Sequence, residues 1–174
     1  MRKTIFTLVL GLFVVLALNA QTHHRCSHQM AFTKSQISDT LDAIHYTIYI
    51  DELDFDNKEI IAQTDIILAS KVDNLDEVKL ELIDLTVDDV SIDGNSAPGF
   101  THQSGILTIQ LDSPINTGQT IEVSIDYHGE PFHEDWGGFH WSGEYCFNLG
   151  VGFVSIPHNL GKTWFPCIDD FRDR

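Results

Sequence analysis

The sequence Trp164-Phe165-Pro166-Cys167-Ile168-Asp169-Asp170 decides how the rest of the chain is interpreted. Two aromatic residues lead into Pro166, which has no N–H group to donate to a sheet and so marks the end of a strand or a turn. Apolar Cys167 is close behind, and acidic and basic residues then mix to the end of the chain. We predict a strand that leaves the core here and enters a charged loop, with Trp164 and Phe165 on opposite sides of the sheet.

Upstream of this stretch, apolar and polar residues alternate along several runs, which is the pattern of a half-buried β-strand. The first run places Ile44, Tyr46, Ile48 and Ile50 on one face. Turn-forming residues separate the runs, and the pair Asp88-Asp89 interrupts one of them, where we predict a β-bulge. The predicted strands cover residues 44–50, 60–68, 78–82, 85–92, 100–103, 106–111 and 121–127.

Short strands separated by turn signals at this spacing predict an all-β domain, an antiparallel β-sandwich. The chain has 174 residues, enough for one domain with a sizeable core, and shows no convincing amphipathic helix after its N-terminal segment. Ile61 and Ile67 add apolar residues to the second face of the 60–68 strand, so we expect part of that face to be covered. Residues 132–143 are rich in glycine and aromatic side chains and are predicted to form a loop.

The closing stretch resembles the W-F-P-C-x-D-x-x-x-x-[KR] segment in the N-terminal β domain of the aminopeptidase N family of zinc metallopeptidases. The His45-Tyr46 pair at the start of the first strand and the Gly138-Phe139 element are similar to further features of that family. Phe171 stands where the family usually has proline. The residues of the closing motif that fall in register are Trp164, Phe165, Pro166, Cys167, Asp169 and Arg174.

The resemblance implies a saddle-like β-sandwich over residues 41–174 that is incomplete at its C-terminal end, before the catalytic zinc domain of the family would begin. It implies that the parent protein is a zinc-dependent aminopeptidase that removes N-terminal residues from peptides. In such an enzyme the β domain packs against the catalytic domain of the same polypeptide and shapes substrate access. The resemblance also implies that Cys167 is a small, buried apolar residue.

Catalytic and metal-binding motifs are missing from the chain itself. A zincin site needs H-E-x-x-H on a helix, but His133-Glu134 is followed by Gly137 where the second histidine would stand. No G-x-S-x-G nucleophile motif and no phosphate-binding glycine loop occurs. We therefore predict no catalytic residue, no metal site and no cofactor in this chain, which should be inactive alone; zinc would belong to the parent enzyme.

Recognition of the substrate's amino group is a further role that the resemblance assigns to the β domain. In the family, a Gln or Glu upstream of the Pro-Cys pair holds the free N-terminus of the substrate. This position falls on Pro157, which has no side-chain acceptor. Ser155 and His158 are the nearest polar residues, and either is a candidate for the same contact.

The N-terminal residues have the features of an export signal. Residues 1–20 combine Arg2 and Lys3 with an apolar run shorter than the roughly 20 residues of a membrane-spanning helix, and they end in Ala20. We predict cleavage at this point, a flexible mature N-terminus over residues 21–40, and no membrane span after cleavage. The expected location is the periplasm, the cell surface or the extracellular medium.

Composition narrows the range of partners. The chain has 10 Lys+Arg and 26 Asp+Glu, a formal net charge of −16, which argues against a nucleic-acid partner because phosphate binding depends on Lys and Arg. Export permits a disulfide, but Cys26, Cys146 and Cys167 allow three pairings, and an odd count leaves at least one cysteine unpaired within the chain. The histidines around Cys26 lack a second ligand pair at zinc-finger spacing.

Two other classes of protein fit the same residues. One is a non-catalytic secreted β-sandwich that acts as a binding or adhesion module, and the other is a catalytically inactive relative of the enzyme used as a scaffold. An H-E-x-x-H motif further along the parent polypeptide would distinguish the enzyme from the binding module.

Overall fold

The computed structural model describes residues 37–170. This part of the chain is nearly all antiparallel β-structure, and its only helical elements are one turn of α-helix, α2 (Ile37–Thr40), and one turn of 3-10 helix, η1 (Gly161–Thr163). The predicted all-β fold is therefore confirmed. The predicted signal peptide, Cys26 and Arg174 lie outside the described residues.

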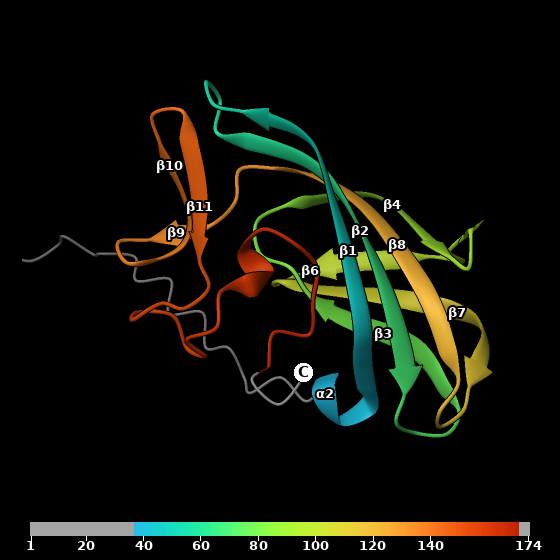
Figure 1. Ribbon diagram of the computed structural model, residues 1–174. Coiled ribbons are helices and arrows are strands. Elements are labelled where there is room, and N and C mark those ends of the chain that lie inside the picture. Colours follow the sequence, from blue (N-terminus) through green and yellow to red (C-terminus); the bar gives the residue numbers. More distant parts are fainter. Residues whose placement is uncertain (1–36, 171–174) are drawn as a thin grey trace, which may run out of the picture.

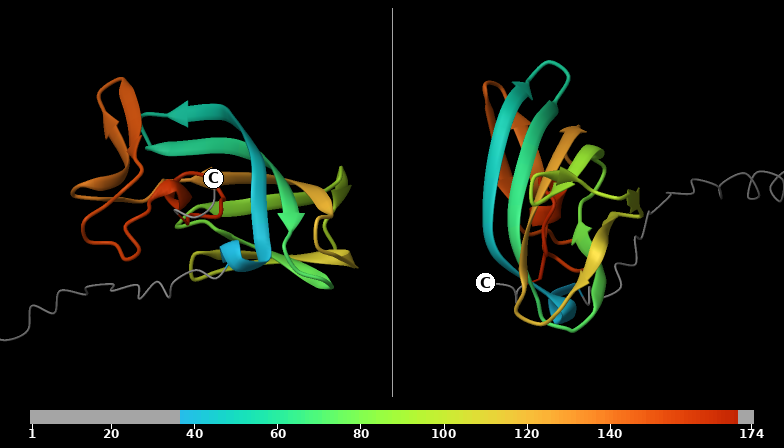
Figure 2. Two further views of the ribbon diagram at one scale, coloured as in Figure 1. Left: turned by 60° about the horizontal axis from the view of Figure 1, so that its bottom comes forward. Right: turned by 90° about the vertical axis from the view of Figure 1, so that its right-hand side faces the viewer.

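Eleven strands lie between the two helical turns, and they form three sheets. Their bounds are β1 Leu41–Asp54, β2 Glu59–Ser70, β3 Leu75–Glu81, β4 Thr86–Ile92, β5 Asn95–Ser96, β6 Phe100–Gln103, β7 Ile106–Ile115, β8 Thr120–Gly129, β9 His133–Glu134, β10 Gly137–Ser142 and β11 Tyr145–Leu149. The largest sheet has the order β1-β2-β8-β4-β5, the second β3-β7-β6 and the third β11-β10-β9. Figure 1 and Figure 2 show the five-stranded sheet curving over the β3-β7-β6 sheet, with the β9–β11 sheet to one side.

The hydrophobic core lies between the first two sheets. On β2, the alternation expected from the sequence holds, because Ile60, Ile66 and Leu68 are buried. The second face is not covered at Ile61 and Ile67, as we had expected, because both are exposed in the described structure. The facing sheet contributes residues from β3 and β7 with the same two-residue period. The fully buried side chains of these two strands are Val78, Leu80, Leu107 and Ile109.

The first strand departs from the predicted alternation. Ile44 was expected on the face of Tyr46 but lies in a bulge and is exposed. Ile50 does lie on that face, opposite buried Ala62, although it is 46% exposed. The pairing of β1 with β2 shifts between Ala43 and His45 and again between Ile50 and Glu52. Each bulge adds one residue and moves the following side chains to the other face. The bulge predicted at the Asp88-Asp89 pair is confirmed, since the pairing of β4 with β8 shifts between Val87 and Asp89.

Residues 132–143 are not a loop, as the sequence predicted, but contain β9 and β10. Two glycines make this compact hairpin possible. At Gly137 (φ 145°) an added Cβ would lie 2.6 Å from the backbone oxygen of Val151, and at Gly138 (φ 78°) it would lie 2.5 Å from the backbone oxygen of Phe132. Any other residue would clash with backbone at these positions, so glycine serves close strand packing here.

The closing segment is also not the predicted strand. It forms η1 and then an extended stretch with a single antiparallel bridge, in which Cys167 N–H donates to the oxygen of Glu81 at 3.0 Å. Trp164 and Phe165 do not lie on opposite sides of a sheet: both are half-buried and their rings meet edge to face, with centroids 4.8 Å apart. The helical turn removes the two-residue alternation on which the prediction depended.

Candidate functional site

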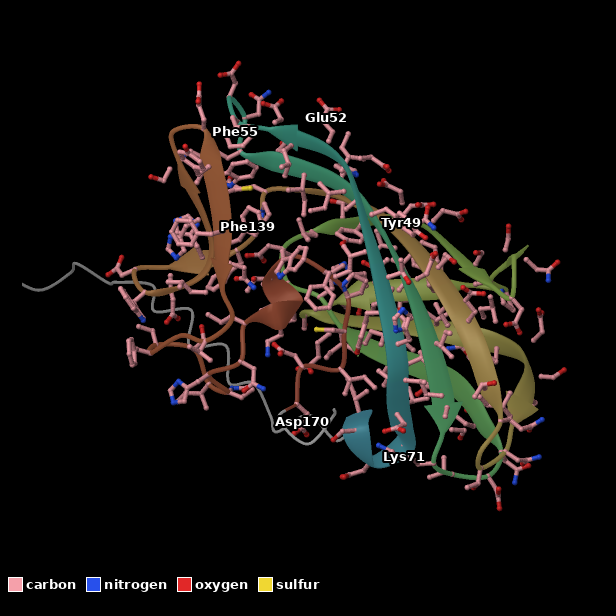
Figure 3. The ribbon with its side chains drawn as sticks, viewed as in Figure 1. Tyr49, Glu52, Phe55, Lys71, Phe139 and Asp170 are labelled. Carbon is pink, nitrogen blue, oxygen red and sulfur yellow. The ribbon has the colours of Figure 1, made fainter. Side chains whose placement is uncertain are left out.

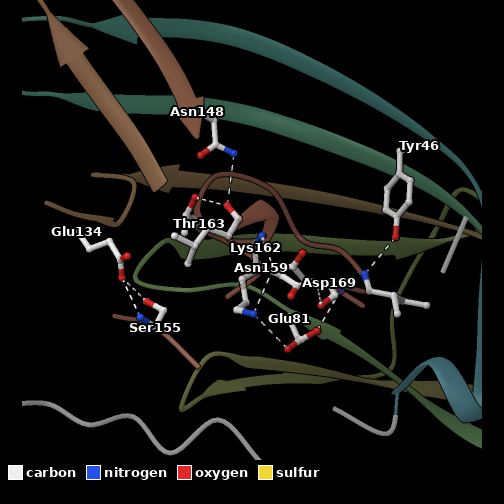
Figure 4. Close-up of polar contacts among 11 residues, drawn as sticks. Tyr46, Glu81, Glu134, Asn148, Ser155, Asn159, Lys162, Thr163 and Asp169 are labelled. Atoms are coloured by element: carbon white, nitrogen blue, oxygen red, sulfur yellow. Dashed lines mark hydrogen bonds and ion pairs between the residues drawn. The ribbon is translucent and has the colours of Figure 1, made fainter. Parts of the chain in front are cut away.

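A loop of residues 150–158, called here the 150–158 loop, follows β11 and is held in place by one carboxylate. Glu134 on β9 accepts hydrogen bonds from the backbone N–H groups of Phe153, Val154 (3.0 Å) and Ser155 (2.9 Å), and from the Ser155 hydroxyl (2.7 Å). The contact with Ser155 is drawn in Figure 4. Partial burial disfavours ionisation of Glu134, but the hydrogen bonds from Val154 and Ser155 outweigh it and hold the pKa of the carboxyl below its ordinary value.

The hydrogen bonds of Glu134 show what this residue of the His133-Glu134 pair does in the structure. Its oxygens are committed to the 150–158 loop, so Glu134 acts as an anchor for this loop. The His133 ring lies beside the His140 ring, with centroids 5.4 Å apart. Between residues 37 and 170, no group of three or more His, Cys, Asp or Glu side chains is placed to hold a metal ion.

Large apolar side chains project into solvent from this anchored loop and from the β9–β10 turn. We call Trp136, Phe153, Val154 and Ile156 the apolar platform. Phe153 and Val154 are 74% and 78% exposed, and the Phe153 ring stacks on Trp136 at a centroid distance of 6.3 Å. A cluster of exposed apolar residues on a loop with fixed backbone is typical of a surface that another protein covers.

The two candidates for contact with a substrate amine lie on the 150–158 loop, beside the apolar platform. Ser155 donates its hydroxyl hydrogen to Glu134 and keeps its oxygen lone pairs as acceptors. His158 is exposed, and its backbone oxygen accepts a hydrogen bond from the N–H of Gly152 at 2.8 Å. Pro157 lies between them.

Behind this loop, a buried charge cluster fixes the closing motif against β3. The Nζ atom of Lys162 lies 3.2 Å from Oδ2 of Asp169 and 3.6 Å from Oε1 of Glu81, and the lysine side chain is 0% exposed. The backbone N–H of Asp169 donates to Oε2 of Glu81 at 3.0 Å, and Asn159 donates its amide to the backbone oxygen of Asp169 at 3.0 Å (Figure 4). Burial raises the pKa of the Glu81 carboxyl, and the Lys162 ammonium opposes that rise.

This cluster gives the motif residue Asp169 a structural role. Its side chain meets Lys162 while its backbone meets Glu81 and Asn159, so it ties η1, β3 and the start of the closing segment together. Sequence reasoning did not identify Lys162, because a lone lysine beside aromatic residues carries no periodic signal. It also missed the apolar platform, although an apolar run from Val151 to Ile156 with no partner strand was a visible cue.

A groove of about 590 Å³ opens between the start of β1 and the closing segment. Its walls include Ile44 and His45 on one side and Phe165, Asp169 and Asp170 on the other. The backbone N–H of Ile168 donates to the Tyr46 hydroxyl across it at 3.0 Å (Figure 4).

The structure describes two of the three cysteines. Cys167 is buried, as the resemblance implied, and Cys146 on β11 is half-buried. They do not pair with each other, and the two pairings that involve Cys26 fall outside the described residues. Within residues 37–170, no helix has the length and apolar character needed to cross a membrane.

Solved structures that share this fold include M1 zinc metallopeptidases. An M1 zinc metallopeptidase mutant from Deinococcus radiodurans, bound to a Tyr-Ser-Ala substrate, matches 77% of this chain with 30% of its own chain, at a TM-score of 0.66 and 19% sequence identity. The fold is that of the M1 peptidase N-terminal β domain. A two-domain M1 zinc metallopeptidase mutant bound to L-arginine gives the same values. Native yeast LTA4 hydrolase matches 80% of this chain with 23% of its own, at a TM-score of 0.57 and 18% identity.

The chain therefore spans less than a third of the length of these structural neighbours. No protein-family model and no curated protein sequence matches it. At this level of identity the likeness concerns the fold, and the fold expected from the closing motif is confirmed.

Proposed function

We propose that this chain is the N-terminal, non-catalytic β domain of an exported zinc-dependent aminopeptidase. The observation that carries the proposal is the fold match, at a TM-score of 0.66 over 77% of the chain, to two-domain M1 zinc metallopeptidases. The W-F-P-C-x-D motif supports it independently, because Cys167 and Asp169 are the residues that fix the closing segment to β3. In this proposal zinc and the H-E-x-x-H helix belong to another domain of the same polypeptide.

The apolar platform is the surface that we propose faces the catalytic domain. Burial of an exposed apolar side chain contributes roughly 1.5–3 kcal/mol, so covering Phe153, Val154 and Ile156 would stabilise a domain contact substantially. Because Glu134 already fixes the backbone of this loop, docking of the catalytic domain would cost less conformational entropy.

Ser155 and His158 lie on the same loop, and a domain covering the platform would place them at its border. There, either side chain can accept a hydrogen bond from the ammonium group of a peptide substrate: Ser155 through its hydroxyl oxygen and His158 through a neutral ring nitrogen. The net charge of −16 also favours approach of a cationic amine. In this way the β domain would shape which peptides reach the zinc site.

Sequencing the reading frame that encodes the chain, on both sides of residues 1–174, tests the proposal. We expect an H-E-x-x-H segment with helical periodicity downstream, followed by a further glutamate that completes the ligand set. A longer frame without these ligands would refute the enzyme and favour a scaffold or a binding module. Export is tested separately, by N-terminal sequencing of the protein recovered outside the cytoplasm, which we expect to begin at Gln21.

A further inference from the structure

The apolar platform lies in a part of the chain that has no positive charge of its own on its surface. Residues 80–161 contain no Lys or Arg, so every fixed side-chain charge in this stretch is a carboxylate. Lys162 comes next, but its side chain is 0% exposed and meets the carboxylates of Glu81 and Asp169. Within the described structure, the surface of β4 to β11 therefore presents no lysine or arginine side chain.

The exposed lysines of the described residues lie elsewhere. Lys71 is beside α2, far from Phe139 of the β9–β11 sheet (Figure 3). Lys79 forms an ion pair with Glu77 on its own strand, β3. Lys58 is in the β1–β2 turn, which Figure 1 shows near the tip of the β10–β11 hairpin, whereas the 150–158 loop leaves from the base of that hairpin. These ammonium groups therefore do not balance the charge at the platform.

Two carboxylates lie at the platform itself. Glu134 accepts hydrogen bonds from the N–H groups of Val154 and Ser155 at 3.0 Å and 2.9 Å, which places its charge directly behind the loop. Asp135 is exposed and directly precedes Trp136. Among residues 37–170, no lysine, arginine or histidine forms an ion pair with either carboxylate. The platform is thus an apolar patch with uncompensated negative charge at its border.

This combination selects between the surfaces that could cover the platform. Partners in a protein contact have complementary potentials, and like charges brought together weaken the contact. A second copy of this chain would bring the same carboxylates together, and an anionic membrane surface would repel them. A surface with an apolar centre and positive side chains at its border satisfies both features of the platform.

We propose that the surface covering the apolar platform carries lysine or arginine side chains that meet Asp135 and the charge of Glu134, and that a domain following residue 174 in the same polypeptide supplies it. The inference rests on the proposed function in one respect, that such a domain covers the platform. It adds that attraction between unlike charges, together with apolar burial, fixes how the two domains lie on each other. The contact then weakens as salt is added, because exposed charges are screened.

Oxidation of side chains by hydroxyl radicals, followed by mass spectrometry, measures the contact on the native polypeptide and on the 174-residue chain. In the chain alone, Trp136 and Phe153 should oxidise quickly, because they are 57% and 74% exposed. In the native polypeptide both should oxidise about fivefold more slowly or less, because the centre of an interface is nearly closed to water.

A urea titration of the same oxidation compares the strength of the contact between variants of the native polypeptide. At low salt, Asp135→Lys should make the contact about tenfold weaker, so that Trp136 becomes reactive at a lower urea concentration. Asp112→Lys, at a matched exposed carboxylate on β7, should leave that concentration unchanged. In about 0.5 M salt the two variants should behave alike, because the charges are then screened. In the 174-residue chain, both variants should unfold at the same urea concentration as the native sequence, which excludes a folding defect.

An Asp135→Lys polypeptide that behaves like the native one, or a native contact that salt does not weaken, overturns the inference. Protection of Trp136 that needs anionic lipid vesicles, or that needs a high protein concentration, also overturns it, because the cover is then a membrane or a second copy. An H-E-x-x-H polypeptide in which Trp136 oxidises as fast as in the chain alone refutes the inference and leaves the proposed function standing. Salt-sensitive protection in a polypeptide without that motif supports the inference and refutes the enzyme.

Discussion

Replacing Lys162 with methionine would test the buried charge cluster most severely. The ammonium lies 3.2 Å and 3.6 Å from the carboxylates of Asp169 and Glu81. At an effective dielectric constant of about 20, each attraction is on the order of 5 kcal/mol, and it is opposed by the cost of burying the lysine. Methionine keeps most of the side-chain volume but leaves two carboxylates buried without their cation. We expect a loss of about 3–5 kcal/mol in the free energy of unfolding.

The assay is urea unfolding of the 174-residue chain, followed by tryptophan fluorescence. With a slope of about 2 kcal/mol per molar urea, the expected loss lowers the midpoint by roughly 2 M. Lys71→Met is the matched control, because Lys71 also meets a carboxylate, that of Asp42 at 3.0 Å, but the two side chains are 37% and 48% exposed. An exposed pair of this kind contributes about 0–1 kcal/mol.

The pH dependence of the unfolding free energy gives a second test of the Lys162→Met variant. Burial raises the pKa of Glu81 above its ordinary value of 4.5, so the folded state binds this proton more tightly than the unfolded state does. Stability from this group is therefore gained as pH falls toward 4.5, and lost as pH rises through the folded-state pKa. Lys162→Met should recover part of its loss between pH 7 and about pH 5, as Glu81 becomes protonated. The double variant Lys162→Met with Glu81→Gln should recover part of the loss already at about pH 7, because it has no carboxylate at position 81. Equal midpoints for Lys162→Met and Lys71→Met would refute the reasoning.

Three further outcomes are expected. In the native chain, amide exchange of the 150–158 loop should rise as pH falls below 4.5, through the lowered pKa of the Glu134 carboxyl. Glu134→Gln should abolish this rise, and Glu130→Gln, at an exposed neighbour, should leave it intact. Gly138→Ala should cost about 1–3 kcal/mol more than Gly118→Ala in the same unfolding assay, because both have positive φ but an added Cβ meets backbone only at Gly138. Replacing Phe153 and Val154 by serine should reduce binding of a hydrophobic dye while the unfolding free energy stays within about 0.5 kcal/mol, since both side chains are mostly exposed.

Local patterns in the sequence predicted most of the sandwich. Period-two alternation found β2, β3 and β8, and the Asp88-Asp89 pair revealed a bulge, because these features depend on which face of one strand meets the core. The phase of β1 was right from Tyr46 to Ile50, which lie opposite buried residues of β2. It was wrong at Ile44, because the bulge between Ala43 and His45 is set by the pairing with β2 and has no local signal.

Contacts between distant segments explain the remaining errors. The glycine-rich residues 132–143 were predicted to be a loop, because the backbone neighbours that require glycine at Gly137 and Gly138 are known only from the fold. Lys162 was not identified because its two carboxylate partners come from β3 and from the closing segment, seven residues further along the chain. The apolar platform is likewise defined by exposure, which a sequence does not record.

Peptidase activity of the native polypeptide tests the central claim most directly. An antibody raised against residues 37–170 would recover the polypeptide that carries this chain from the cells that produce it, and hydrolysis of an aminoacyl-arylamide would then be measured with and without a zinc chelator. We predict hydrolysis that the chelator abolishes and added zinc restores, and none from the 174-residue chain alone. A homogeneous native polypeptide that binds no zinc and releases no amino acid would contradict the assignment to a zinc aminopeptidase.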